Sequence, residues 1–276
     1  MTLTVGSGVY QWSQVYRERG QNWQDHLDEI LGQVAAAQLT CWEQFVGPPA
    51  EVDALAPLLA RHHLAAPSAY ANVELHTPEW RRHADACIAD ATHCASLGTR
   101  LIVVNPVPIR WGGMEDKNDE QLQRQAEALR YLHAELARQG LVLAYHTHDP
   151  EMRAAAREFH HMIQATRDVG MQLCLDTHWV FRGAGNSNLA LLDIVGLYAD
   201  RIATLHLRQS HGGTWCELLE PGDIDYAPLV ALLKRAGFNG PAHLEICQEK
   251  GTVRTMSLEE THRRSALYWR RLWQTS

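Results

Sequence analysis

The chain has 276 residues, 46% hydrophobic and 21% charged, so it can bury one sizeable core. Its formal charge of -7 and its lack of a basic cluster exclude nucleic acid as an expected partner. The sequence has no apolar run of about 18 residues and no secretory leader at its start, and its six cysteines are scattered. We therefore expect no membrane partner, reduced thiols and a cytoplasmic location.

Short β-rich apolar runs alternate with longer amphipathic segments along the whole chain, without a linker or a low-complexity tract. One domain over residues 1–276 is the economical interpretation. The apolar runs predict eight strands: Leu3–Val9, Leu39–Phe45, Leu64–Tyr70, Arg100–Asn105, Leu141–His146, Met171–Asp176, Arg201–His206 and Pro241–Ile246.

Helical periodicity fills the spaces between these runs. Apolar side chains at i, i+3, i+4 and i+7 predict helices that each bury one stripe, as in Leu27, Ile30, Leu31 and Val34, and in Leu229, Leu232, Leu233 and Ala236. Asp225 is expected to be a helix N-cap. Left-handed caps are expected at the glycines that precede strands: Gly140, Gly170, Gly237 and Gly240.

Eight β-then-α units in 276 residues have a mean period of about 34 residues, which suits a (β/α)8 barrel. The competing architecture is a doubly wound sheet, which needs a glycine-rich phosphate turn after an early strand. The segment Gly6–Gln11 lacks the third glycine of that turn. The sequence therefore predicts the α/β class and a single (β/α)8 TIM barrel.

Functional side chains of a TIM barrel project from the carboxyl ends of its strands, and these ends are unusually polar here. The carboxylates of Asp176 and Glu245 and the imidazoles of His146 and His206 form a mixed set that suits one divalent ion. Barrel closure is expected to bring the four together. The structural alternative is that the carboxylates cap helices and the histidines are hydrogen-bonded core residues.

Several strings of the sequence resemble the xylose isomerase-like TIM-barrel superfamily of sugar isomerases, epimerases, inosose dehydratases and endonuclease IV. They are Leu143–Asp149, Cys174–Trp179, His206–Arg208, Leu244–Glu245 and Gly222–Tyr226. The resemblance implies one Mn²⁺-like ion, with Co²⁺, Zn²⁺, Fe²⁺ and Mg²⁺ as alternatives, held by Asp176, His206 and Glu245. His146 stands where the epimerases carry glutamate. The Tyr-His-x-His pattern around it is more similar to the inosose dehydratases and related keto-sugar lyases.

The resulting hypothesis is a metal-dependent isomerase or epimerase that acts on a keto-sugar or cyclitol through a metal-stabilised enolate. Glu245 is the first candidate for the base, and His148 and Glu217 are candidates for a second proton carrier. For His148, a role in orienting a metal ligand is an equal alternative. A lyase or dehydratase that eliminates or adds water at a 3-keto-sugar or inosose shares the enolate, and the sequence does not separate the two.

Two tryptophans and two arginines are the expected substrate-binding residues. Trp179 and Trp215 offer flat faces to a sugar ring, and ordinary packing is the alternative. Arg182 and Arg208 follow the sixth and seventh predicted strands, where a guanidinium can reach substrate oxygens. Solvent-exposed ion pairing is the alternative for both.

Two functions of other classes compete with this hypothesis. An endonuclease IV-like nuclease needs a three-metal cluster and a cationic groove, which the acidic balance disfavours. A non-catalytic sugar-binding barrel has little reason to gather imidazoles and a glutamate around one point. Substrate identity, stereochemistry and subunit number, a homo-oligomer included, are left open by the sequence.

Overall fold

Eight parallel strands close into a barrel in the computed structural model, which describes residues 3–275. The strand order around the barrel is β1-β10-β7-β6-β5-β4-β3-β2, and the predicted (β/α)8 TIM barrel is confirmed. The strands are β1 (Val5–Gly8), β2 (Cys41–Phe45), β3 (Ser68–Val73), β4 (Leu101–Pro106), β5 (Val142–Tyr145), β6 (Gln172–Asp176), β7 (Ile202–Leu207) and β10 (Ala242–Leu244).

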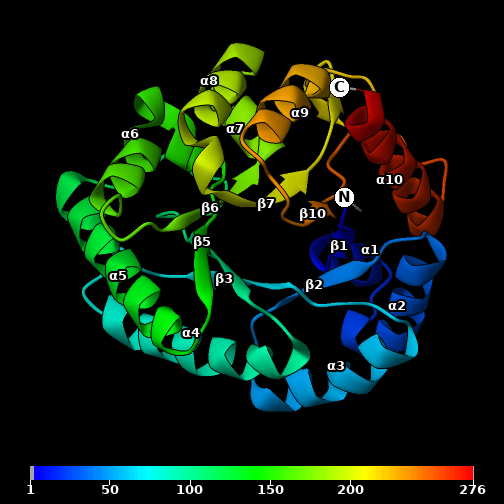
Figure 1. Ribbon diagram of the computed structural model, residues 1–276, viewed down its shortest axis with the longest axis horizontal. Coiled ribbons are helices and arrows are strands. Elements are labelled where there is room, and N and C mark those ends of the chain that lie inside the picture. Colours follow the sequence, from blue (N-terminus) through cyan, green and yellow to red (C-terminus); the bar gives the residue numbers. More distant parts are fainter. Residues whose placement is uncertain (1–2, 276) are drawn as a thin grey trace.

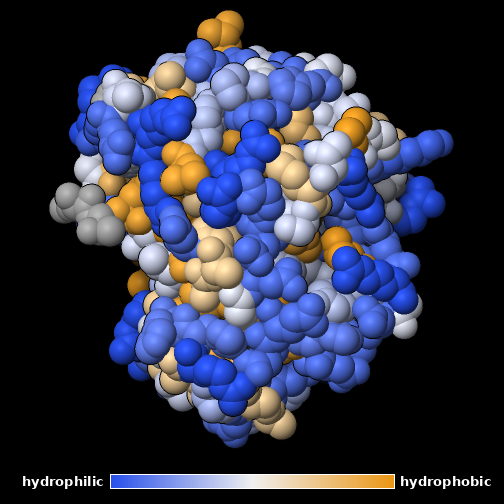
Figure 2. Space-filling view, turned by 90° about the vertical axis from the view of Figure 1, so that its right-hand side faces the viewer, coloured by the Kyte–Doolittle hydropathy of each residue, from blue (hydrophilic) through white to orange (hydrophobic). Residues whose placement is uncertain are grey.

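Helices surround the barrel on its outside (Figure 1). They are α1 (Tyr10–Glu18), α2 (Leu27–Ala36), α3 (Pro49–Arg61), α4 (Trp80–Cys94), α5 (Asp119–Arg138), α6 (Asp149–Ala165), α7 (Thr177–Gly183), α8 (Asn188–Tyr198), α9 (Tyr226–Arg235) and α10 (Leu258–Thr275), with single 3₁₀ turns at Trp23–His26, Ala95–Leu97 and Ala199–Arg201. Their apolar stripes face the strands and their polar faces meet water. Accordingly, the face shown in Figure 2 is largely hydrophilic with small apolar patches.

The predicted helix signals hold with two exceptions. Ala236, expected in the buried stripe with Leu229 and Leu233, is exposed and follows α9, which ends at Arg235. Asp225 caps α9, its side chain accepting a hydrogen bond from the Ala227 amide. Gly140, Gly170 and Gly237 adopt left-handed backbone angles, as expected. Gly240 is wrong as a left-handed cap, because its φ is not positive. A Cβ at this position would overlap the carbonyl of Ala203, so glycine is needed here for close backbone approach.

Strand register places polar side chains of different strands beside one another. Asp176 of β6 is the register partner of His206 of β7. On the other side of the barrel, Asn72 of β3 is the register partner of Asn105 of β4. The predicted strand Leu64–Tyr70 is shifted, since β3 begins only at Ser68, after a proline that has no amide hydrogen to donate.

A short hairpin after β7 has no counterpart among the predicted strands. It consists of β8 (Ser210–His211) and β9 (Thr214–Trp215), which are antiparallel. The two residues between them, Gly212 and Gly213, both have positive φ angles, as a two-residue hairpin turn requires. This hairpin carries Trp215 to the mouth of the barrel.

None of the helices within residues 3–275 is both long and apolar enough to cross a membrane.

Candidate active site

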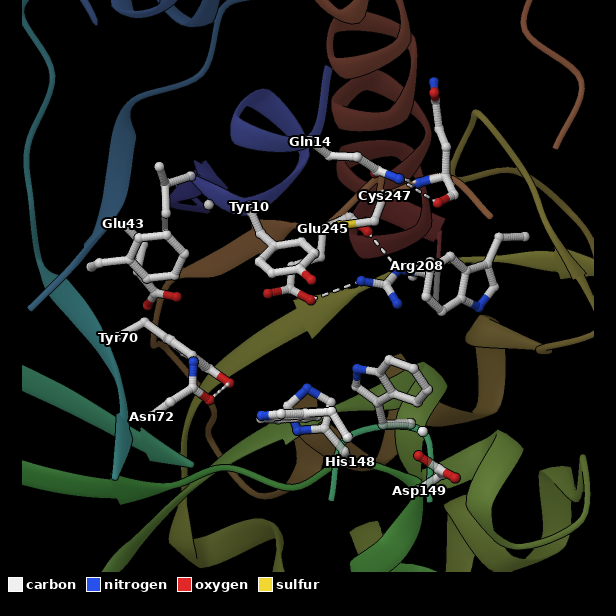
Figure 3. Close-up of a pocket in the computed structure, with 18 residues that line it drawn as sticks. Tyr10, Gln14, Glu43, Tyr70, Asn72, His148, Asp149, Arg208, Glu245 and Cys247 are labelled. Atoms are coloured by element: carbon white, nitrogen blue, oxygen red, sulfur yellow. Dashed lines mark hydrogen bonds and ion pairs between the residues drawn. The ribbon is translucent and has the colours of Figure 1, made fainter. Parts of the chain in front are cut away.

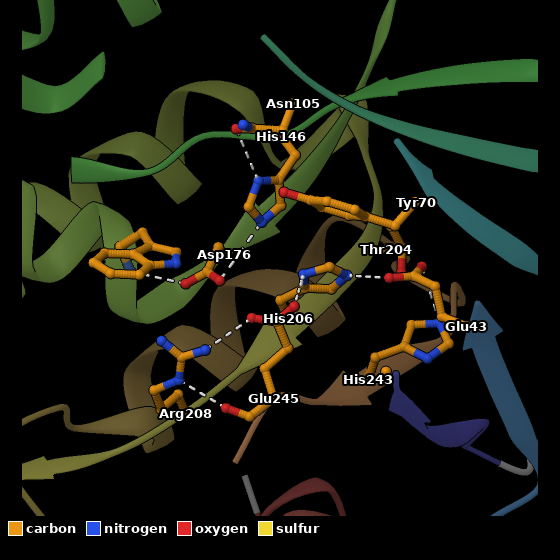
Figure 4. A network of polar contacts seen from close by, with 12 residues as sticks. Glu43, Tyr70, Asn105, His146, Asp176, Thr204, His206, Arg208, His243 and Glu245 are labelled. Carbon is orange, nitrogen blue, oxygen red and sulfur yellow. Dashed lines mark hydrogen bonds and ion pairs between the residues drawn. The ribbon is translucent and has the colours of Figure 1, made fainter. Parts of the chain in front are cut away.

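Four acidic and imidazole side chains meet at the carboxyl ends of consecutive strands in the barrel (Figure 4). Donor atoms of Asp176, His206 and Glu245 all lie within 4.8 Å of one another. His146, which follows β5, has its Nε2 atom 3.6 Å from Oδ2 of Asp176. The structure therefore brings together all four residues expected to hold the metal.

The donor atoms of this cluster fit a divalent ion. His146 Nε2 and Asp176 Oδ2 are buried and have no hydrogen-bond partner, a costly state for polar atoms that ligation would relieve. Two carboxylates and two imidazoles are the donor set of Mn²⁺, Zn²⁺, Co²⁺ or Fe²⁺ sites. Cys174 also lies within reach of His146 and His206. Burial raises the pKa of the Cys174 thiol to about 12, so the carboxylates are the better donors.

Glu43 on β2 contacts this cluster, and it was not identified as a site residue from the sequence. Its Oε1 atom lies 2.8 Å from Nε2 of His206, and Ser68 donates a hydrogen bond to its carboxylate. Burial opposes a charge on Glu43, but His206, His243 and Ser68 lower its pKa to about 2. An ionised carboxylate therefore fixes the His206 ring, whose Nδ1 atom lies 3.1 Å from Oε1 of Glu245. The sequence signal that could have identified Glu43 is the presence of a glutamate within the predicted strand Leu39–Phe45.

Arg208 is anchored beside Glu245. Its Nη2 atom lies 2.9 Å from Glu245 Oε2, and its Nε donates to the Glu245 carbonyl at 2.7 Å. Burial raises the pKa of Glu245, but His206 and Arg208 outweigh burial and lower it overall. The guanidinium also lies over the ring of Trp215, 3.9 Å from its centroid. Arg208 is buried, yet its Nη1 atom has no hydrogen-bond partner.

A cavity of about 540 Å³ adjoins this cluster and is lined by Glu245 and Arg208 (Figure 3). Five expected residues line it: His148, Trp179, Arg208, Trp215 and Glu245. It is also lined by aromatic and polar residues that the sequence analysis did not single out, among them Tyr10, Gln14, Glu43, Tyr70, Asn72 and Trp111. These come from β1 to β4 and the segments after them, none of whose residues was predicted to belong to the site.

His148 contributes an imidazole to this cavity. Its Nδ1 atom lies 2.8 Å from Oδ1 of Asn105, which leaves Nε2 for the cavity. Burial and the neighbouring His146 lower the pKa of His148 to about 3, so the ring is neutral near pH 7. The rings of Trp111 and Trp179 each lie 5.0 Å from the His148 ring.

Five expected residues do not line the cavity. Three of them, His146, Asp176 and His206, are buried in the barrel interior, and the other two, Arg182 and Glu217, are held by other contacts. Arg182 pairs with Glu249 at 2.8 and 2.9 Å and donates to the Gly213 carbonyl, while its guanidinium lies 4.8 Å from the Trp215 ring centroid. Glu217 accepts hydrogen bonds from Thr255 and from the Met256 amide. The structure therefore places the Arg182 guanidinium against Trp215. It places the Glu217 carboxylate in contact with the loop that contains Thr255 and Met256.

Solved structures of low sequence identity share this architecture. They include D-allulose 3-epimerase from Methylomonas sp. in complex with D-allulose (17% identity, TM-score 0.75, covering 98% of this chain and 96% of that chain). A second is the 3-keto-D-glucoside 4-epimerase YcjR from E. coli (15%, 0.73, 98% and 100%), and a third is the IOLI protein with a bound zinc atom (16%, 0.69, 99% and 98%). At these identities the likeness establishes the fold.

A comparison with curated protein sequences gives no match. A family model described as "Xylose isomerase-like TIM barrel" matches residues 31–272, which is most of the chain and contains all four candidate metal ligands. The chain belongs to the xylose isomerase-like TIM-barrel family.

Proposed function

We propose that the protein is a divalent-metal-dependent isomerase or epimerase that acts on a keto-sugar or a cyclitol. The observation that carries the proposal is the convergence of Asp176, His206 and Glu245 donor atoms, with His146 beside them, next to a cavity of about 540 Å³ that Glu245 lines. Neighbouring structures in the same fold are named as sugar epimerases, and one holds zinc. Mn²⁺ is the first choice of ion, with Zn²⁺, Co²⁺, Fe²⁺ and Mg²⁺ as alternatives.

His146, Asp176, His206 and Glu245 would hold the ion. A divalent ion at this place supplies Lewis acidity, which polarises a carbonyl or hydroxyl oxygen and lowers the cost of an adjacent enolate. The two carboxylates balance the ion's two positive charges. Glu43 keeps the His206 ring oriented, because it occupies Nε2 and leaves Nδ1 for the ion.

Two groups at the cavity can accept a proton at neutral pH. Glu245 is ionised and lines the cavity, so it is the proposed base for the proton on the carbon next to the ketone. The neutral His148 ring is proposed to move the proton between substrate oxygens through Nε2. In Figure 3 both approach the same space from different strands. Glu217 has no part in this proposal, because its carboxylate is engaged by Thr255 and Met256.

The aromatic residues are assigned two different tasks. Trp179 and Trp111 flank His148 and would contact the apolar face of a sugar ring. Trp215 instead supports Arg208, whose guanidinium covers its ring, and Arg182 lies against the same indole. The free Nη1 of Arg208 is the proposed donor to a substrate oxygen.

Metal analysis and solvent exchange test the proposal. Purified protein is expected to bind about one Mn, Zn, Co or Fe per chain, and Asp176→Asn is expected to lose it. Ketohexoses, inososes and 3-keto-glucosides are then incubated in deuterium oxide, and proton NMR follows exchange next to the ketone. Glu245→Gln is expected to fold and to lose this exchange.

The products decide between the two reaction types. An epimer or an aldose–ketose pair supports the isomerase proposal, whereas an unsaturated product assigns the chain to the lyases. A protein that neither binds nor is activated by a divalent ion contradicts both assignments.

A further inference from the structure

Asn105 stands between the two histidines that follow β5. It is fully buried near the end of β4. Its Oδ1 atom lies 2.8 Å from Nδ1 of His148 and 3.4 Å from Nδ1 of His146. Figure 4 shows the second of these contacts. A single amide oxygen thus faces one ring nitrogen of each histidine.

The orientation of the Asn105 amide is set from its other side. Its Nδ2 atom donates to Oδ1 of Asn72 at 3.1 Å, and the Tyr70 hydroxyl donates to the same oxygen at 3.3 Å. The register of β3 and β4, which pairs Asn72 with Asn105, brings the two amides together. With Nδ2 directed at Asn72, the oxygen of Asn105 must face the rings, and a carbonyl oxygen can only accept hydrogen bonds.

We propose that Asn105 is a positioning residue that holds both His146 and His148 in the tautomer protonated at Nδ1. The nitrogen that carries the proton in a neutral imidazole is set by the hydrogen bond it makes. In this tautomer the unshared electron pair of each ring lies on Nε2. For His146 that atom faces Asp176, and for His148 it is the atom left for the cavity. One buried amide therefore sets the tautomer of both the proposed metal ligand His146 and the proposed proton carrier His148.

The roles of the two Nε2 atoms rest on the proposed function, but the tautomers do not. The competing arrangement has the Asn105 amide turned over, so that Nδ2 donates to unprotonated Nδ1 atoms. His146 would then carry its proton on Nε2 and direct it at Asp176 Oδ2, 3.6 Å away. That arrangement blocks the electron pair that an ion at Asp176 needs. The two arrangements differ in which ring nitrogen of each histidine carries the proton, and this can be measured without metal or substrate.

Nitrogen NMR of the metal-free protein tests the proposal directly. Protein with ¹⁵N-labelled histidine is examined near neutral pH by long-range proton–nitrogen correlation, and His146→Gln and His148→Gln identify the two rings. In the wild type and in Asn105→Asp, which retains an acceptor, both rings are expected as the Nδ1-protonated tautomer. In Asn105→Leu, which has a similar size and no acceptor, both are expected to lose it. Nε2-protonated rings in the wild type overturn the proposal, as do unchanged rings in Asn105→Leu.

Zinc affinity supplies a second measurement, by competition with a chelating dye. Asn105→Leu is expected to bind Zn²⁺ about 10 to 100 times more weakly than the wild type, and Asn105→Asp to recover most of the loss. Equal affinities of wild type and Asn105→Leu contradict the proposal. If Asn105→Leu does not fold, the wild-type and Asn105→Asp spectra still decide. Nδ1-protonated rings in a protein that binds no metal refute the proposed function alone, and zinc binding with Nε2-protonated rings refutes this inference alone.

Discussion

Oε1 of Glu43 lies 2.8 Å from Nε2 of His206, although β2 and β7 are not neighbours in the barrel. The same ring presents Nδ1 to Glu245 at 3.1 Å. The imidazole therefore spans the barrel interior between the carboxylates of Glu43 and Glu245. Such a pair fixes both the orientation and the tautomer of a ligating histidine.

Glu43→Gln removes the supporting charge and keeps the shape of the side chain. We expect its affinity for Mn²⁺ or Zn²⁺ to fall about 10- to 100-fold, because the His206 ring loses its ionised partner. Isothermal titration with the metal measures this. Glu51→Gln, at an exposed position in α3, is the control and should bind like the wild type. Unchanged affinity in Glu43→Gln would show that His206 needs no such support.

Arg208→Gln tests the group that neutralises Glu245. Loss of the guanidinium removes a buried donor at the cavity and should lower the rate of proton exchange about 10²- to 10³-fold. Metal content should remain, since Arg208 is not a donor to the ion. Arg182→Gln is the matched control, because Arg182 contacts Trp215 and Glu249 outside the cavity lining, and its effect should be much smaller. Equal rate losses in the two variants would argue that Arg208 acts only through packing.

The buried carboxyl of Glu151 in α6 predicts a pH dependence of stability. Burial and the neighbouring Glu158 raise its pKa to about 7, against the opposing charge of Lys117. In the unfolded chain a glutamate titrates near 4.3, so between about pH 4.3 and pH 7 the folded state keeps a proton that the unfolded state has lost. The contribution of Glu151 to the free energy of unfolding therefore falls as pH rises through this window. Above about pH 7 the whole destabilisation by the buried charge is present.

Glu151→Gln should accordingly be more stable than the wild type at pH 8, by up to about 4 kcal/mol, and close to it at pH 4. The amide oxygen can still accept the hydrogen bond that the carboxylate receives from the His148 amide. Urea unfolding at the two pH values measures the difference. Glu127→Gln, on the exposed face of α5, serves as the control. A gain that is the same at pH 4 and pH 8 would rule out ionisation as its cause.

Gly240→Ala should destabilise the barrel, because the added methyl group would overlap the Ala203 carbonyl. We expect a loss of about 1–3 kcal/mol or more, which is typical of overpacking. Gly196→Ala is the matched comparison: this glycine lies in α8 with no atom within 4 Å of its added Cβ. It should gain up to about 1 kcal/mol from helix propensity. Thermal unfolding of both proteins checks the prediction, and a neutral Gly240→Ala would contradict it.

Much of the fold is predictable from local patterns. The β-rich runs locate all eight barrel strands, because a strand buried on both faces is apolar and is bounded by turn residues. The β8–β9 hairpin was missed because each of its strands has only two residues. Gly212-Gly213 is the signal that could have found it. Gly240 was assigned a left-handed cap because close backbone approach leaves no local trace in a sequence.

The convergence of the four proposed metal ligands was predictable because barrel topology brings strand ends together. The supporting residues were not, since the contact of Glu43 with His206 depends on a distance across the barrel that strand positions do not specify. The same holds for Arg182, whose place behind Trp215 follows from a pairing with Glu249, 67 residues away in the chain. Loop conformation decides such contacts, and residue spacing does not encode it.

The proposed ion donors all come from β5, β6, β7 and β10 or the residues just after them, whereas Tyr10 and Trp111 reach the cavity from segments that follow β1 and β4. Glu43 and Asn105, which contact the proposed donors, lie within β2 and β4 and not in those segments. New segments grafted after β1 and β4 could therefore change which molecule enters the cavity, while the proposed metal ligands stay unchanged.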